Sequence, residues 1–192
     1  YESQFAIINS EDFGVPQRRR RLVLLAMRGK PLPLEWWNAH GSVRRTVRDA
    51  IAHMPAPGAS GDPLHDAPEV RSASVMARIR ATPPDGGGQR NLAPEHRCPC
   101  HQRSDGYSDV YGRMEWDAAS PTITGGCHNP SKGRFLHPVA DRAITLREAA
   151  LLQSFPHDYR FDMSRGKEHV AWQIGNAFPP QLILPIARTI RK

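Results

Sequence analysis

Two short apolar runs near the start of the chain, joined by a polar turn, constrain its fold more than any other feature. The runs are residues 4–8 (QFAII) and 22–27 (LVLLAM), and Asp12, Gly14 and Pro16 lie between them. Runs of this length bounded by turn residues predict two buried strands. Because successive positions are apolar, we expect other layers to cover both faces of this sheet. Little else in the chain can supply those layers.

The long middle of the chain, from Gly29 to about Arg113, is rich in Pro, Gly, His and Arg and has weak periodicity. Two short helices are expected there, over residues 45–53 and 68–80, and residues 82–90 (TPPDGGGQR) predict a loop. Such a segment is more typical of a recognition module than of a catalytic sheet.

The pattern becomes regular again towards the end of the chain. Thr145 and Glu148 predict a capping box at the start of a helix over residues 146–153, which Phe155-Pro156 terminates. A last helix is expected over residues 180–190. Pro185 inside it predicts a kink or a later start, because proline removes one helical hydrogen bond.

Charge and cysteine usage narrow the class of protein. The net charge of +7 suits a polyanionic partner such as DNA, although an inert basic surface would give the same balance. Three cysteines indicate no disulfide framework and favour a reducing cytoplasm. No apolar run approaches the roughly 20 residues that span a bilayer, so no membrane partner is predicted. The start at Tyr1 rather than Met predicts a piece of a longer polypeptide.

Three motifs follow one another along the chain. They are residues 9–21 (NSEDFGVPQRRRR), 144–156 (ITLREAALLQSFP) and 173–180 (QIGNAFPP). Taken alone, they are a basic turn, a structural helix and a turn leading into a helix. In this order they resemble the last three sequence blocks of DNA (cytosine-5) methyltransferases of the bacterial modification type. The resemblance covers residues 1–27 and about 118–190.

The resemblance implies an α/β fold, here a mixed α+β assembly. The chain would form the C-terminal part of a doubly wound catalytic domain together with a small, loop-rich target recognition domain. Residues 1–27 would carry catalytic-domain strands and the arginine motif, and residues 28–156 the target recognition domain. Residues 157–192 would return to the catalytic domain and end in a C-terminal helix.

The resemblance also implies roles for the arginine run. The catalytic-pocket positions of the family correspond to Arg19 and Arg21, with Gln17 beside them. A permanently charged guanidinium there would stabilise the negative charge that builds on a cytosine flipped out of DNA. Arg18 and Arg20 alternate with these residues along an extended chain, so they would face phosphates or solvent.

Residues 120–138 (SPTITGGCHNPSKGRFLHP) combine phosphate-binding side chains with glycines. A surface loop is the plainer interpretation, and contact with the DNA backbone is the functional one. The resemblance implies that Thr122 holds the phosphate beside the flipped nucleotide. The predicted DNA-binding residues here are Thr122, Thr124, Ser131, Lys132 and Arg134.

A cofactor and a metal can also be considered. The resemblance implies that Gly175, Asn176 and Ala177 line the pocket for S-adenosylmethionine. Cys98 and Cys100 are spaced more tightly than usual zinc ligands and lack a paired second half, so no metal is predicted. Nor is Cys100 the family's nucleophile, because His rather than Gln follows it and it lies downstream of the arginine run.

The family's donor-binding glycine motif, its Pro-Cys-Gln nucleophile and its Glu-Asn-Val block are not found in this sequence. Covalent attack on cytosine needs a positioned thiolate and an acid at N3. The chain is therefore expected to be inactive in methyl transfer by itself.

The leading hypothesis is the C-terminal part of a cytosine-5 DNA methyltransferase of a restriction-modification system. It would carry target recognition and part of the active-site wall. Its expected partners are double-stranded DNA, the missing N-terminal catalytic part and, through residues 22–27, further copies of itself. Two alternatives stay open: a non-catalytic DNA-binding specificity subunit of a split methyltransferase, and a degenerate remnant.

Overall fold

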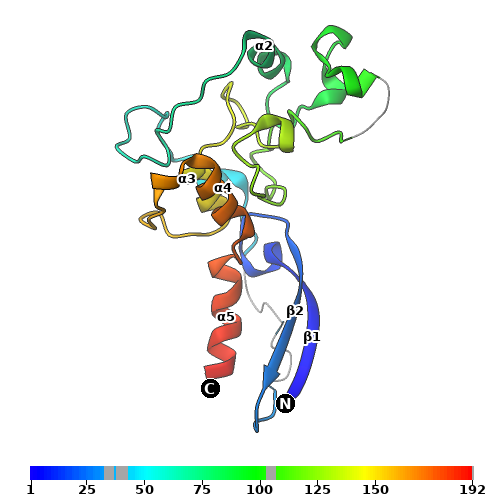
Figure 1. The fold of residues 1–192 in the computed structure, drawn as a ribbon. Coiled ribbons are helices and arrows are strands. Elements are labelled where there is room, and N and C mark those ends of the chain that lie inside the picture. The colour runs from blue at the N-terminus through cyan, green and yellow to red at the C-terminus, as the bar shows by residue number, and fades with distance from the viewer. Residues whose placement is uncertain (33–36, 38–42, 103–106, 192) are drawn as a thin grey trace.

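The computed structural model of the chain describes residues 1–32, 37, 43–102 and 107–191 and has a mixed α/β architecture (Figure 1). The regular elements of this described part are β1 (Glu2–Asn9), β2 (Arg20–Met27), α1 (Val47–Ile51), α2 (Ala73–Ala81), α3 (Leu146–Leu152), α4 (Lys167–Asn176) and α5 (Pro180–Arg191). Short 3-10 helices occur at Ser10–Phe13, Gln89–Asn91, Pro94–His96, Pro99–Gln102, Pro130–Lys132 and Met163–Arg165.

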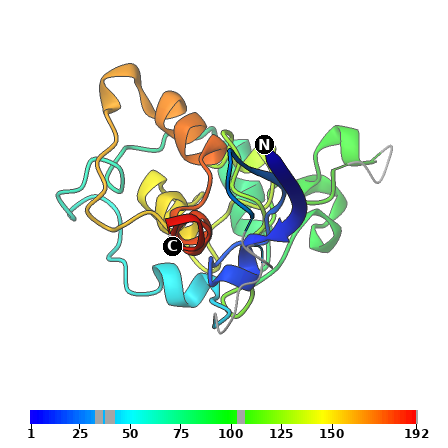
Figure 2. The same ribbon diagram turned by 90° about the horizontal axis from the view of Figure 1, so that it is seen from below.

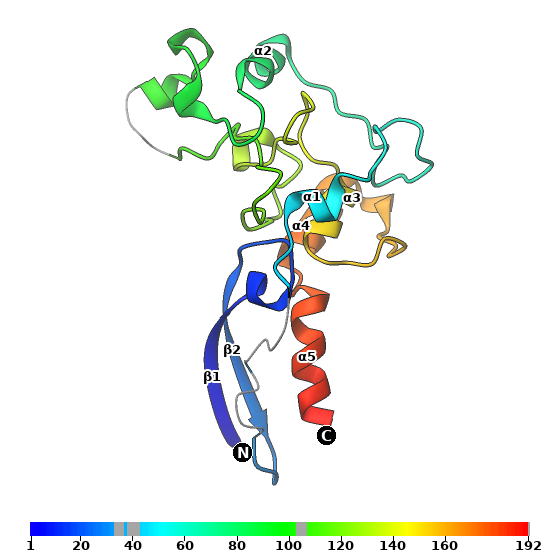
Figure 3. The ribbon, with the colours of Figure 1, turned by 180° about the vertical axis from the view of Figure 1, so that it is seen from behind.

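The elements form three levels. At one end, β1, β2 and α5 project side by side as a stalk, and both chain termini lie at its free end (Figure 1). Seen from below, α5 stands end-on beside the strands (Figure 2). Helices α1, α3 and α4 pack together above the stalk, as the view from behind shows (Figure 3). Helix α2 and the long loops that Arg113 and Arg134 hold together form the far end of the molecule. We call this region the upper part.

The strand, turn and strand prediction is confirmed. β1 and β2 pair antiparallel, and the 3-10 helix with Gly14 in the left-handed region (φ 77°) joins them. Ile8 on the inner face packs against Leu182 and Ile186 of α5. The outer face carries four exposed apolar side chains, from Phe5, Ile7, Leu22 and Leu24. Only one face of the pair is thus covered by the described residues, although the sequence is apolar on both.

The main core lies at the central level. Helices α1 and α3 both begin with capping boxes, at Thr46 with Asp49 and at Thr145 with Glu148, so the predicted box is confirmed. Buried apolar side chains of α1, α3 and α4 form one cluster with residues of the 114–135 segment. Helix α4 thus shares a core with α3, and this core holds the base of the stalk.

The upper part is held together by buried arginines. The guanidinium of Arg113 is almost fully buried and donates to the carbonyl oxygens of Ile79, Thr82, His137 and Ala140. It also pairs with Asp141. Carbonyl oxygens in loops have no ladder partners, so a buried multi-donor side chain satisfies them where secondary structure does not.

The predicted start of one helix was wrong. α2 begins at Ala73 rather than at Pro68, because the Ser72 hydroxyl accepts from Val75 N and so caps the helix there. The helix predicted over residues 146–153 is confirmed as α3, which ends at Leu152 with Gln153 as its C-cap, and the chain then turns through Ser154 in the left-handed region (φ 66°).

The last helix shows no late start. α5 begins at Pro180, a favoured first helical position, and continues through Pro185. The mixed α/β prediction is confirmed, whereas the doubly wound sheet and the division at residues 27 and 156 stay predictions. Of the helices in the described residues, none is long and apolar enough to cross a membrane.

Candidate functional site

The arginine run leads from the turn into β2 and brings four distant segments together. Arg19 is 4% exposed, and its guanidinium points into the protein. Nη1 donates to the carbonyl oxygen of Ile123 at 2.9 Å, and Nη2 donates to that of Gly175 at 2.8 Å. The arginine motif is thereby fastened both to the predicted DNA-contact segment and to the end of α4.

Gln17 and Gln153 complete this junction. The Gln17 amide nitrogen donates to Gln153 Oε1 at 2.7 Å, and its Oε1 accepts from Ile123 N at 2.9 Å. Gln153 Nε2 donates in turn to the carbonyl oxygen of Ile174 at 2.6 Å. Both glutamine side chains are fully buried. We call Gln17, Arg19 and Gln153 the buried junction. Its bonds run mainly through groups that water cannot reach, so the joined segments keep one relative position.

The guanidinium of Arg19 stays positively charged although it is buried in the junction. Burial first, and then the neighbouring charge of Arg21, lower the pKa of Arg19 to about 10, so its side chain stays cationic at neutral pH. Arg18 and Arg20 are exposed and Arg21 is half-buried, which follows the predicted alternation. Among the described residues, Arg21 donates only to the carbonyl oxygen of Arg20. Arg21 therefore keeps donors for an external group, whereas both Nη atoms of Arg19 are taken by peptide oxygens.

The predicted DNA-contact segment lies directly beside the arginine run. Arg18 N donates to Ser120 O at 2.9 Å, and the Thr122 hydroxyl donates to Arg18 O at 2.8 Å. Thr124 is exposed and accepts from Gly126 N. The segment is thus positioned by backbone contacts, and Thr122 has its hydroxyl proton already committed.

The three remaining predicted contacts differ in their availability. Ser131 and Lys132 are exposed. Arg134 is mostly covered, and its guanidinium donates to the carbonyl oxygens of Gly86, Gly87 and Arg113 and to Asp109. Arg134 therefore acts in the structure as a scaffold for the upper part, like Arg113.

The predicted cofactor residues lie at the end of α4. Gly175 is in such close contact with the 124–125 backbone that an added Cβ would lie 2.2 Å from the Thr124 carbonyl carbon and the Gly125 nitrogen. Asn176 is exposed, and its amide makes no hydrogen bond with the described residues. Ala177 is half-buried beside it. A free amide next to a small apolar residue, held from behind by Gln153 and Arg19, is suited to line one wall of a small-molecule pocket.

The cysteines do not form a reactive centre. Cys127 is buried, and this burial raises the pKa of its thiol to about 12, so it is protonated at neutral pH. Among the described residues, no three His, Cys, Asp or Glu side chains lie close enough to hold a metal ion.

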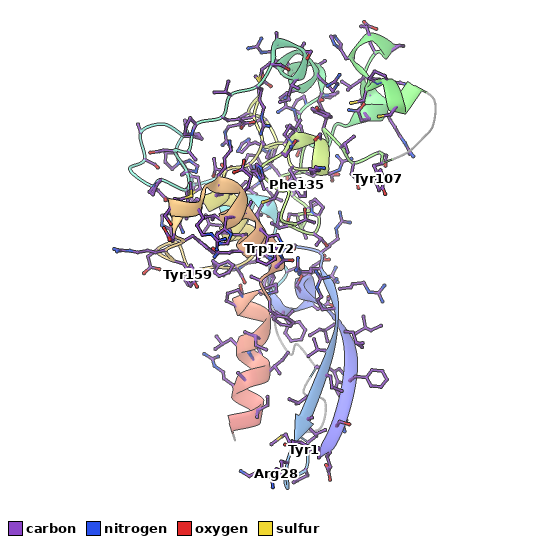
Figure 4. All side chains as sticks on the ribbon, viewed as in Figure 1. Tyr1, Arg28, Tyr107, Phe135, Tyr159 and Trp172 are labelled. Carbon is purple, nitrogen blue, oxygen red and sulfur yellow. The ribbon has the colours of Figure 1, made fainter. Side chains whose placement is uncertain are left out.

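Two functional contributions were not predicted from the sequence. Gln153 was expected only as part of a structural helix, yet it links the arginine motif to α4. Trp172 is 61% exposed, and its backbone leaves little room for any side chain at Gly125. Figure 4 places Trp172 where the helical level meets the strands. An apolar aromatic residue at a polar helix position was the one signal that could have identified it.

The chain belongs to the C-5 cytosine-specific DNA methylase family, whose model matches residues 1–192. It is 38% identical to the type II methylase M.HgiDII of Herpetosiphon aurantiacus, over the whole chain and 56% of that relative. It is 33% identical to the type II methyltransferase M1.BsuMI of Bacillus subtilis, over 92% of the chain and 40% of that protein. The resemblance seen in the three motifs is thus confirmed.

A solved structure supports the fold. A candidate DNA modification methyltransferase encoded within an Escherichia coli prophage matches the whole chain with a TM-score of 0.70 at 20% identity. The match covers 60% of that structure. The chain thus spans about half the length of these curated relatives, and 60% of this solved structure.

Proposed function

We propose that this chain supplies target recognition and one wall of the active site in a cytosine-5 DNA methyltransferase of the bacterial modification type. The complete enzyme would transfer a methyl group to C5 of a cytosine rotated out of double-stranded DNA. The buried junction carries this proposal, because it gathers the arginine motif, the 120–125 segment and the end of α4 at one place. Those are the segments that must meet around a flipped base.

Two roles divide the arginine run. Arg21, which keeps free donors, would stabilise the negative charge that forms on the cytosine ring after attack. Arg19 and Gln17 would position Arg21 and the DNA segment from behind. The exposed side chains of Arg18, Arg20 and Thr124 would contact phosphates, together with Ser131.

The donor would be S-adenosylmethionine, which supplies the electrophilic methyl group when bound. Asn176 and Ala177 would line its pocket, and the missing side chain of Gly175 lets α4 approach the DNA segment. The free Asn176 amide offers both a donor and an acceptor for such a ligand. Gln153 and Arg19 would hold this wall in place while DNA binds.

We further propose that the thiolate and the acid at cytosine N3 come from a preceding part of the same enzyme. The bare outer face of the strands supports this, and so do the exposed Ile183 and Leu184 of α5. Apolar faces of this kind are usually covered in a finished domain. A doubly wound sheet built onto them would cover both.

Transfer of tritiated methyl groups to DNA tests the proposal. The product of the whole reading frame should be active and the 192-residue chain inactive. In the whole product, Arg21→Ala should lower kcat by about 10²- to 10³-fold, the usual effect of removing one charge-stabilising donor. Arg20→Ala is the matched control, and it should weaken DNA binding with little change in kcat.

Three outcomes would contradict the proposal. Turnover by the 192-residue chain alone would refute the shared active site. If the product of the whole reading frame transfers no methyl groups, the chain is instead a DNA-binding specificity subunit or a degenerate remnant. An equal loss of kcat in Arg20→Ala and Arg21→Ala would remove the assigned role of Arg21.

A further inference from the structure

A pocket of about 590 Å³ opens on the surface between the upper part and the 120–125 segment. Phe135, a buried residue of the main core, lines this pocket, and Tyr107 lies at the pocket edge with 86% of its surface exposed (Figure 4). The side chains that matter for its chemistry are Tyr107, Asp109, Thr122, Thr124, Lys132 and Phe135.

The pocket is formed before any ligand arrives, because its walls are bonded to one another. Tyr111 N donates to Pro130 O at 2.7 Å, which joins the 107–111 turn to the 3-10 helix that carries Lys132. Arg134 lies between these walls and bonds to Asp109 and to three carbonyl oxygens. Because the wall is already ordered, ligand binding does not have to order it. The pocket can therefore discriminate between ligands without losing affinity.

The unused polar groups of the pocket suit a base edge better than a phosphate. Lys132 is exposed, and its ammonium makes no hydrogen bond or ion pair with the described residues. The Asp109 side chain is 66% exposed and uses one oxygen for Arg134. A carboxylate and the apolar Phe135 would both disfavour a phosphate, whereas base edges present acceptors and amino donors together.

The pocket is also close to the predicted catalytic wall. Thr122 lines it and donates to Arg18 O, one residue from Arg19. A base bound here would therefore belong to the DNA immediately around the flipped cytosine.

We propose that this pocket reads a G·C base pair neighbouring the target cytosine. Lys132 donates to O6 and N7 of the guanine, and Asp109 accepts from N4 of its paired cytosine, which are the pairings that these side chains favour. The Tyr107 ring packs along the edge of the pair. The inference rests on the proposed function and adds to it the residues that set the recognised sequence.

Sequencing of a randomised DNA library tests this, with the product of the whole reading frame. One arm identifies the methylated sequences, and the other identifies sequences retained by binding, which requires no turnover. The wild-type protein should prefer G·C at one position near the target. Lys132→Gln should lower that preference by about 5- to 150-fold and leave the other positions unchanged. Asp109→Asn should relax the same position.

Two matched controls separate base reading from other effects. Lys132→Arg should keep the preference, because arginine donates to the same guanine atoms. Arg20→Gln should weaken binding equally for all sequences and reduce its salt dependence. A uniform loss in Lys132→Gln, or an unchanged preference, would overturn the inference. Selective binding without methyl transfer would instead refute the proposed function and leave the base reading supported.

Discussion

The stalk and the upper part are stabilised by different kinds of interaction. The stalk has clear periodicity, with strands that alternate between buried and exposed positions and a helix that packs along one face. The apolar side chains on the outer face of its strands nevertheless stay exposed. The upper part has little periodicity, and its loops are instead tied together by Arg113 and Arg134.

This difference teaches where each region draws its stability. The stalk buries apolar side chains on only one face of its strands. A further apolar layer packed on the outer face would therefore stabilise it. In the upper part, buried carbonyl oxygens must be satisfied, so the loss of one arginine side chain weakens the pairing of several of them at once. Variants that remove apolar contacts or polar donors can therefore test each region separately.

The largest effect is expected for Arg113→Gln in the upper part. The variant removes the guanidinium from four carbonyl oxygens and from Asp141, and the oxygens of Thr82 and His137 then keep no donor among the described residues. This should cost about 3–5 kcal/mol of unfolding free energy. Urea denaturation measures the loss. Arg48→Gln is the control, because Arg48 pairs with Asp117 at the surface and should shift the midpoint only slightly. Equal shifts would show that burial of the donor is not what matters.

A smaller loss is expected for Leu182→Ala in the stalk. Leu182 is fully buried between α5 and the strands, so its truncation should cost about 3 kcal/mol. Leu184→Ala on the same helix is the control, because Leu184 is 48% exposed. Thermal unfolding of both variants would measure the difference. If Leu184→Ala proved as damaging, another layer would already cover that face.

The pH dependence of the upper part should be set in part by His137. Burial lowers the pKa of His137 to about 4, so the folded state resists protonation that the unfolded state accepts near pH 6.5. The contribution of neutral His137 to the stability of the folded state is therefore complete above pH 6.5 and is lost as the pH falls towards 4. About 2 kcal/mol should disappear between pH 8 and pH 5. Chemical denaturation at both values should give a smaller pH difference for His137→Gln, and an equal one would contradict the assignment.

The smallest effect on stability is expected at the outer face of the strands. Leu22→Thr with Leu24→Thr keeps strand-forming residues at solvent-exposed positions, so unfolding should change by less than about 0.5 kcal/mol. Self-association of the 192-residue chain should nevertheless fall, because these exposed apolar side chains form the predicted contact between copies. Sedimentation velocity measures it. A wild-type chain that stays monomeric at high concentration would remove the predicted interface.

The sequence by itself determined the elements that depend on neighbouring residues. The capping box at Thr145, the paired strands and the alternation of the arginines follow from local periodicity and hydrogen bonding. The family, too, could be identified from the order of three short motifs. The start of α2 was missed because Pro68 and Ser72 are both good helix starters, and the structure places the cap at Ser72, whose hydroxyl accepts from Val75 N.

The tertiary structure decided where the long side chains point. Nothing near Arg19 in the sequence indicates that its donors bond to Ile123 and Gly175, and nothing near Gln153 indicates a partner 136 residues away. These contacts depend on how loops cross in space, which no local pattern encodes. An arginine looks the same in sequence whether it meets a phosphate or a buried carbonyl oxygen. Only the tertiary contacts separate the scaffold residues Arg19, Arg113 and Arg134, whose guanidiniums bond to peptide oxygens of distant segments, from the exposed arginines of the run.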